Sequence, residues 1–125
     1  MQKIQLSLFL LFLFSFSKSY ADDMDFLVNS TPMQRAESQT RFMQNKLGLS
    51  EEKAAEIQAI NLSFAEMAEP VIKGSGISAI KKYRMKNILD QKDEQLRQVF
   101  NAQQFELYTH LKTELLTVLK ADLSK

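Results

Sequence analysis

The stretch that decides the fold is SEEKAAEIQAINLSFAEMAEPV, residues 50–71. Its large apolar residues recur every three or four positions, which places them on one face of an α-helix. The members of this stripe are Ile57, Ile60, Phe64, Met67 and Val71. Ser50 precedes the stripe as a helix N-cap, and Glu51 and Glu52 follow in the first turn, where negative charge suits the helix dipole. The stretch therefore predicts a long amphipathic helix.

The end of this helix is marked by Pro70, which lacks an amide donor and crowds the preceding turn. We expect a kink or a stop there. The following residues, Lys73-Gly74-Ser75-Gly76, hold two of the three glycines in the chain. Glycines at this density predict a hinge or a turn.

Helices are also predicted on both sides of residues 50–71. Ser30-Thr31-Pro32 is a helix-start signal, and the helix that it opens runs to about Leu47, with Gly48 just past its end. A third helix runs from about Ser78 to Val99. Its apolar members are Ile80, Ile88, Leu89, Leu96 and Val99.

A fourth helix is predicted to begin at Asn101, with Gln104 placed to complete a capping box. One apolar seam along it consists of Phe105, Tyr108, Leu115 and Leu119, and the arc is widened by Leu107, Leu111, Leu116 and Leu123. No segment alternates with period two, so the fold class is all-α. We expect a thin, hairpin-like four-helix bundle. Helix four has more apolar surface than one neighbour covers, which favours a dimer.

The first residues have the three zones of a secretory signal peptide. Lys3 supplies positive charge, residues 6–16 are largely Leu and Phe, and Ser19-Tyr20-Ala21 is a small-x-small cleavage site. The apolar run is about half of the roughly 20 residues that a spanning helix needs. We therefore expect residues 1–21 to be removed after Ala21 and the mature protein to reside in the periplasm.

The mature chain is expected to consist of a flexible, acidic N-terminal arm, residues 22–30, and one helical domain, residues 31–125. The full chain has 16 basic and 15 acidic residues. Loss of Lys3 and Lys18 leaves 14 basic residues against the same 15 acids. This balance disfavours nucleic acid as a partner. There is no cysteine, so stability does not come from disulfides.

The sequence lacks the groups from which a catalytic site is built. It has one histidine and no cysteine, and no serine lies in a nucleophile elbow. We therefore predict that the protein is not an enzyme and uses no cofactor. His110 and Glu114 are spaced as two metal ligands, but a metal site needs three or four, so the expected role is an exposed histidine paired with an acid. Asp22, Asp23 and Asp25 could bind a hard cation weakly, but a flexible acidic arm explains them as well.

A basic stretch without an interrupting acid lies between Glu69 and Asp90. Its cations are Lys73, Lys81, Lys82, Arg84 and Lys86. An ordinary solvated helix face would explain these cations. Interleaved apolar residues, Ile77, Ile80, Tyr83 and Met85, favour a binding surface instead. The predicted client-binding residues are Ile77, Ile80, Lys81, Lys82, Arg84 and Lys86.

Two short segments carry a resemblance to a known family. Leu49-Ser50-Glu51-Glu52-Lys53 and Phe100-Asn101-Ala102-Gln103-Gln104 resemble degenerate copies of the Leu-Thr-x-x-Gln motif of the Spy and CpxP periplasmic proteins. Lys53 replaces the final glutamine in the first copy, and neither copy keeps threonine. Each copy opens a predicted helix, so its cap residues are expected to be mainly structural.

The resemblance implies an interlocked antiparallel dimer that acts in envelope stress. The leading hypothesis is an ATP-independent chaperone that binds unfolded or misfolded exported proteins. Two alternatives are an inhibitory partner of a periplasmic stress-sensor domain and a metal-resistance-associated protein. The chain lacks the histidine-rich segments of the family's zinc-associated branch, and no metal ligands are predicted.

Overall fold

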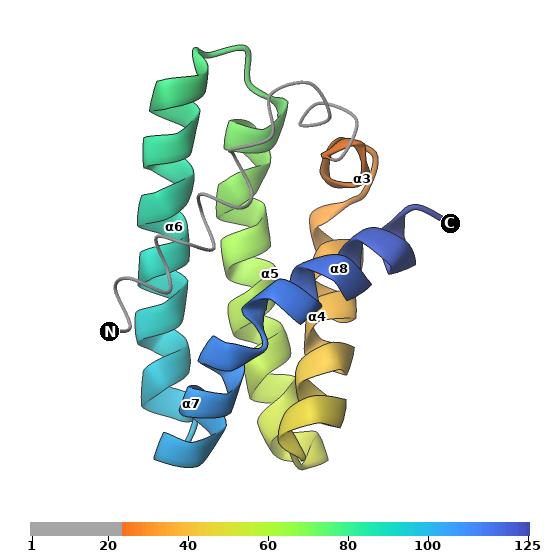
Figure 1. The fold of residues 1–125 in the computed structure, drawn as a ribbon, viewed down its shortest axis with the longest axis vertical. Helices are drawn as coiled ribbons and strands as arrows, with labels where there is room; N and C mark the ends of the chain where they lie inside the picture. Colours follow the sequence, from red (N-terminus) through yellow and green to blue (C-terminus); the bar gives the residue numbers. More distant parts are fainter. Residues whose placement is uncertain (1–23) are drawn as a thin grey trace.

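A computed structural model describes residues 24–125, which form helices joined by short connections and contain no strand (Figure 1). The all-α prediction is confirmed for this part of the chain. The helices are α3 (Asp25–Val28), α4 (Pro32–Leu47), α5 (Glu51–Lys73), α6 (Ser78–Val99), α7 (Ala102–His110) and α8 (Lys112–Leu123). The predicted signal peptide, residues 1–21, lies outside the described residues.

Side-chain caps begin three of these helices where the sequence predicts them. Thr31 accepts a hydrogen bond from the Gln34 amide and the Gln34 side chain accepts one from the Thr31 amide, which completes a capping box. Asn101 and Gln104 form the same arrangement at α7. Ser50 caps α5 by accepting from the Lys53 amide at 3.1 Å. These bonds satisfy amides that have no partner within a helix.

Glycines shape the two tight connections between the long helices. Gly48 ends α4 with φ of 64° and ψ of 44°, the left-handed conformation that glycine adopts without a steric cost. Gly74 ends α5 beside the Pro70 carbonyl, and a Cβ atom at this position would lie 2.7 Å from that oxygen. Both connections therefore require a residue without a Cβ atom.

Three features differ from the sequence predictions. Of the two outcomes expected at Pro70, a kink or a stop, the stop does not occur, because α5 continues to Lys73. The predicted fourth helix is divided at Leu111, whose amide donates to both the Leu107 and Tyr108 carbonyls. Residues 25–28 of the predicted flexible arm form α3, and Phe26 is buried. These four residues of the predicted arm are thus helical, and α3 packs against α5 and α8.

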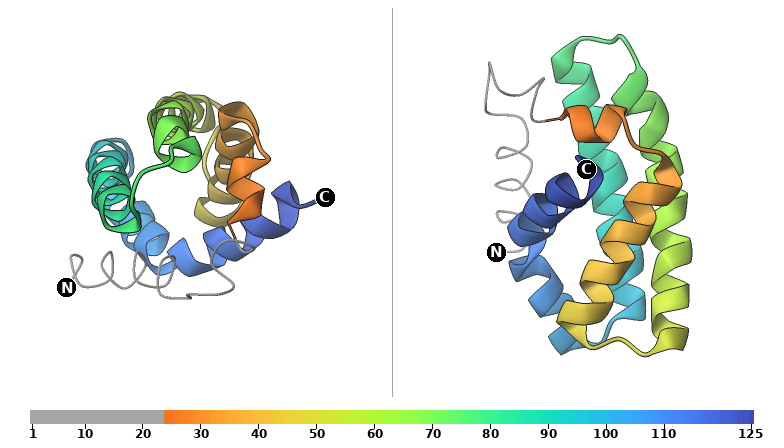
Figure 2. Two further views of the ribbon diagram at one scale, coloured as in Figure 1. Left: turned by 90° about the horizontal axis from the view of Figure 1, so that it is seen from above. Right: turned by 90° about the vertical axis from the view of Figure 1, so that its right-hand side faces the viewer.

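Three long helices stand side by side, and the last two cross them. Helix α5 packs between α4 and α6, and α8 packs back against α4. The bend at Leu111 allows this arrangement, because α7 stays near the end of α6 while α8 turns toward α4 (Figure 1). Seen from above, α4, α5, α6, α7 and α8 enclose a common interior (Figure 2).

The core lies where the α4–α5 and α6–α7 connections meet. Met43, Ile57 and Leu96 are fully buried there, together with Leu49 and Phe100. Within the predicted stripe of α5, Phe64 and Val71 are buried, while Met67 remains exposed. The predicted seam of the last segment is buried at all its positions, namely Phe105, Tyr108, Leu115 and Leu119. No helix in residues 24–125 is long and apolar enough to cross a membrane.

Candidate functional site

The two motif copies meet at one end of the bundle. Leu49 and Phe100, their first residues, are both buried in the same core cluster. Lys53 of the first copy donates from Nζ to the Val99 carbonyl at 3.1 Å, just before the second copy begins. An ammonium group cannot accept a bond from the cap amide, so Lys53 joins two helix ends where glutamine would close a capping box. The motif residues thus serve the fold.

The predicted client-binding residues lie at the opposite end, around the α5–α6 connection and the start of α6. We call Ile77, Ile80 and Tyr83 the apolar tip. These side chains are 66%, 52% and 67% exposed, respectively. Ile77 is the N-cap residue of α6, and Ile80 lies in the first turn of that helix. Ile80 and Tyr83 are three residues apart within α6 and are therefore neighbours on one helical face. Met85, which the sequence grouped with them, instead lines an interior cavity.

The cations beside the apolar tip are less uniform than the sequence indicates. Lys81 donates to the Gly74 carbonyl at 2.9 Å and fastens the connection to α6. Lys86 pairs with Asp90 at 2.6 Å. Arg84 is exposed and lies one residue beyond Tyr83. The structure thus keeps the basic residues on one segment, while Asp90 offsets the charge of Lys86.

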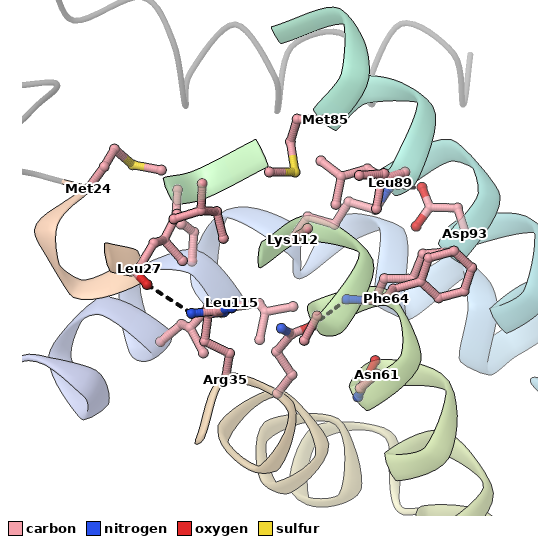
Figure 3. A pocket seen from close by; sticks show the side chains of 18 of the residues that line it. Met24, Leu27, Arg35, Asn61, Phe64, Met85, Leu89, Asp93, Lys112 and Leu115 are labelled. Atoms are coloured by element: carbon pink, nitrogen blue, oxygen red, sulfur yellow. Dashed lines mark hydrogen bonds and ion pairs between the residues drawn. The ribbon is translucent and has the colours of Figure 1, made fainter. Parts of the chain in front are cut away.

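A second candidate site is a cavity of about 130 Å³ inside the ring of helices. Its walls are mainly apolar and come from α5, α6 and α8, with Phe64, Leu89 and Leu115 among them (Figure 3). Met24 and Leu27, at the start of the described chain, line it as well. Helix α3 therefore forms part of the wall, which gives the residues of the predicted arm a structural place.

Polar groups enter this cavity as a connected cluster from α6, α7 and α8. Asp93 accepts a hydrogen bond from the Tyr108 hydroxyl at 2.9 Å and forms an ion pair with Lys112. The Lys112 ammonium also lies 5.3 Å from the centroid of the Tyr108 ring. Burial raises the pKa of Tyr108 well above its usual value, and Asp93 adds to the effect. Tyr108 is thus a neutral donor at physiological pH.

Lys92 is the least compensated charge in the cluster. It is only 6% exposed, and among residues 24–125 its hydrogen-bond partner is the neutral Gln39 side chain. Burial lowers the pKa of Lys92 to about 8; attraction to Asp93 opposes this shift and repulsion from Lys112 adds to it. Among the described residues of the cluster, two lysines therefore share one aspartate, which leaves one excess positive charge.

Two other polar residues line the same cavity. Arg35 is buried, donates to the Leu27 and Ser30 carbonyls, and pairs with Glu69 at 2.7 Å. Desolvation opposes ionisation of Glu69, but the bonds from Arg35 and Lys73 hold its pKa below the usual range. Arg35 is thus matched by a carboxylate, unlike Lys92. The buried Asn61 Oδ1 has no hydrogen-bond partner among the described residues.

The possible metal pair does not come together. His110 is exposed, and its Nε2 lies 3.9 Å from Glu106 rather than near Glu114. Glu114 pairs with Lys46 at 3.0 Å. Within residues 24–125, no three His, Cys, Asp or Glu side chains are grouped as metal ligands. Asp22 and Asp23 lie outside the described residues, and Asp25 belongs to the first turn of α3.

Comparison with models of protein families, with curated proteins and with solved structures finds no match for this chain. The residues of the apolar tip were predictable from the sequence, whereas the cavity was not. Lys92 and Lys112 are 20 positions apart in the sequence, and each looks like an ordinary surface lysine. A signal was present in the apolar positions around Lys112, because a lysine within the wide arc of the fourth helix must lie near the interior.

Proposed function

We propose that this protein is an exported, ATP-independent chaperone that holds partly unfolded envelope proteins on the apolar tip. The observation that carries the proposal is the exposure of Ile77, Ile80 and Tyr83 within seven residues, at 66%, 52% and 67%. Clustered exposed apolar side chains mark interaction surfaces more often than scattered ones do. Unfolded chains offer apolar segments, and burial of these against the tip removes both surfaces from water.

The cations beside the apolar tip add long-range electrostatic attraction of clients to this surface. Two of these cations, Lys81 and Lys82, lie between Ile80 and Tyr83 in the sequence. The other two, Arg84 and Lys86, follow Tyr83. Exposed charges accelerate encounters with oppositely charged partners, while apolar contacts retain the partner afterwards. A client with acidic and apolar segments fits such a mixed surface. The absence of a nucleotide-binding motif in the sequence agrees with release that does not require ATP.

Export and dimerisation complete the proposal. The signal-peptide pattern of residues 1–21 supports export of the mature protein to the periplasm. The resemblance of the two motif copies to those of the Spy and CpxP proteins supports the same compartment and an interlocked antiparallel dimer. Exposed Met33 and Met67 on the hairpin formed by α4 and α5 offer apolar surface for a second copy. Mass spectrometry of the periplasmic fraction should find an N-terminus at Asp22, and sedimentation should find a dimer at micromolar concentration.

The decisive test is suppression of aggregation of several unrelated unfolded proteins without ATP. Ile77→Ser combined with Ile80→Ser should remove most of the suppression, because it takes two large side chains from the tip. Leu107→Ser is the matched control, since Leu107 is 42% exposed on α7, away from the tip (Figure 1). Equal loss with both variants, or full activity of the double variant, would contradict the proposal.

The same assay separates the chaperone from a dedicated sensor inhibitor, which would use the tip for one partner. A chaperone protects unrelated clients, whereas an inhibitor binds one sensor domain saturably and leaves unrelated clients to aggregate. Activity toward a single sensor domain alone would replace the proposed function by the signalling role.

The contribution of the cations is tested by changing Lys81, Lys82, Arg84 and Lys86 to glutamine. We expect slower client association at low salt with little change in dissociation, because the charges act before contact. Wild-type association should also slow as salt rises past about 0.15 M, where the screening length is about 8 Å. Stopped-flow rates that are equal for both proteins at low salt would assign the cations to an ordinary solvated face.

A further inference from the structure

We propose that the interior cavity binds a fatty-acid-type monocarboxylate, with the alkyl chain against the apolar wall and the carboxylate beside Lys92 and Lys112. This site is distinct from the apolar tip, and it concerns a small molecule rather than an unfolded protein. The proposal rests on the charge of the polar cluster, the nature of the wall and the size of the cavity.

The charge of the cluster favours an anion. Lys92 and Lys112 face one carboxylate, Asp93. Among residues 24–125, the only other cation that lines the cavity is Arg35, which is already paired with Glu69. Buried charges in proteins are ordinarily paired, because an unpaired charge in an apolar environment is costly. Lys92 departs from this rule, since its hydrogen-bond partner in the described chain is an amide oxygen. One carboxylate would neutralise the excess charge.

The remainder of the wall favours an alkyl chain. Besides the polar cluster, the lining includes Leu27, Ile72, Met85, Ile88, Leu116 and Leu119. Such residues offer no hydrogen bonds to a polar ligand, while Leu and Met side chains adapt to a flexible chain. A cavity of mainly apolar walls with a few convergent polar groups is the usual form of a small-molecule site. An inorganic anion would leave most of this wall without a contact.

The size of the cavity limits the length of the chain. Its volume of about 130 Å³ is close to that of an engineered apolar cavity of roughly 150 Å³ that admits benzene. A ligand of about six to eight carbons is therefore the expected class, with any longer chain extending past the cavity. Octanoate has this length and carries a single carboxylate, so it is the appropriate probe.

Isothermal titration of the purified protein with octanoate and with 1-octanol tests the proposal. Octanoate should bind at least about tenfold more tightly than the alcohol, because hydrogen bonds between charged groups are stronger than those to a neutral hydroxyl. Lys92→Met should abolish this preference. The matched control is Lys120→Met, which removes a lysine from the exposed side of α8 and should leave binding unchanged.

A second variant tests the location without altering any charge. Ala68 lines the cavity, and Ala68→Leu adds apolar volume to it. We expect weaker octanoate binding with no loss of thermal stability. The double variant of the tip, Ile77→Ser with Ile80→Ser, should bind octanoate as the wild type does, which keeps this site separate from the proposed chaperone surface.

Several outcomes would overturn the proposal. Binding that survives both Lys92→Met and Ala68→Leu would place octanoate elsewhere on the surface. Equal affinity for octanoate and 1-octanol would show that the lysines do not recognise the carboxylate. If octanoate does not bind, and Ala68→Leu converts a dimer into monomers, then the cavity receives a side chain from a second copy of the protein.

Discussion

Lys92→Met should stabilise the protein, although it removes a hydrogen bond. The folded-state pKa of Lys92, about 8, is far below the ordinary lysine value of 10.5. That difference corresponds to a cost of about 3 kcal/mol for keeping the charged lysine buried at pH 7. Loss of the bond to Gln39 costs about 1 kcal/mol. The net gain in the free energy of unfolding is therefore about 2 kcal/mol, or roughly 10 °C in melting temperature for a domain of this size.

The pH dependence of stability provides a sharper signature. Between about pH 8 and 10.5, the unfolded chain binds more protons than the folded one at Lys92, so the free energy of unfolding rises with pH in this window. From pH 7 to 9.5 the wild type should gain about 2 kcal/mol from this group, and the methionine variant should lack that gain. The raised pKa of Tyr108 opposes the trend only above its ordinary value of 10.

Lys112→Met is the matched comparison, and it should lower the free energy of unfolding where Lys92→Met raises it. This lysine pairs directly with Asp93, whose side chain is only 14% exposed. Its removal takes the direct ion pair from a largely buried carboxylate, which keeps only the attraction of Lys92, and should cost about 2 kcal/mol or more. Urea denaturation of the three proteins at pH 7 and 9.5 measures all of these differences. Two results would refute the view that Lys92 lowers the stability of the protein and serves to bind a ligand. One is a Lys92→Met variant that is less stable than the wild type, and the other is a variant whose stability has the wild-type pH dependence.

Other predictions concern the fold itself. Phe64→Asp should destabilise the protein by several kcal/mol, because it places an unpaired charge at a side chain that is 4% exposed; an unchanged melting temperature would contradict the assigned core. Asn101→Ala should cost about 1 kcal/mol through loss of the α7 cap and leave client binding intact, as measured by thermal unfolding and aggregation assays. Gly48→Ala should also destabilise, by about 1 kcal/mol, because φ is 64° there; a more stable variant in urea denaturation would argue against the left-handed turn.

Local sequence determined where most helices begin and end. The caps at Thr31, Ser50 and Asn101 and the left-handed Gly48 were all predictable, because each depends on atoms within a few residues of the helix end. The same holds for the α5–α6 connection, where glycines follow Pro70. The apolar period likewise revealed the buried positions of the last segment. Apolar period and caps are therefore the part of this fold that sequence alone specifies.

Tertiary structure decided the features that depend on residues distant in the chain. Which helix lies opposite a position decides three such features. These are the burial of Phe26, the bend at Leu111 and the exposure of Met67. The cavity belongs to the same class, since Lys92 and Lys112 lie on different helices and share Asp93 only after α8 turns back toward α4. A lysine gives the same local signal whether it is solvated or enclosed. Its charge acquires an energetic cost, and with it a possible function, only when the surrounding helices exclude water.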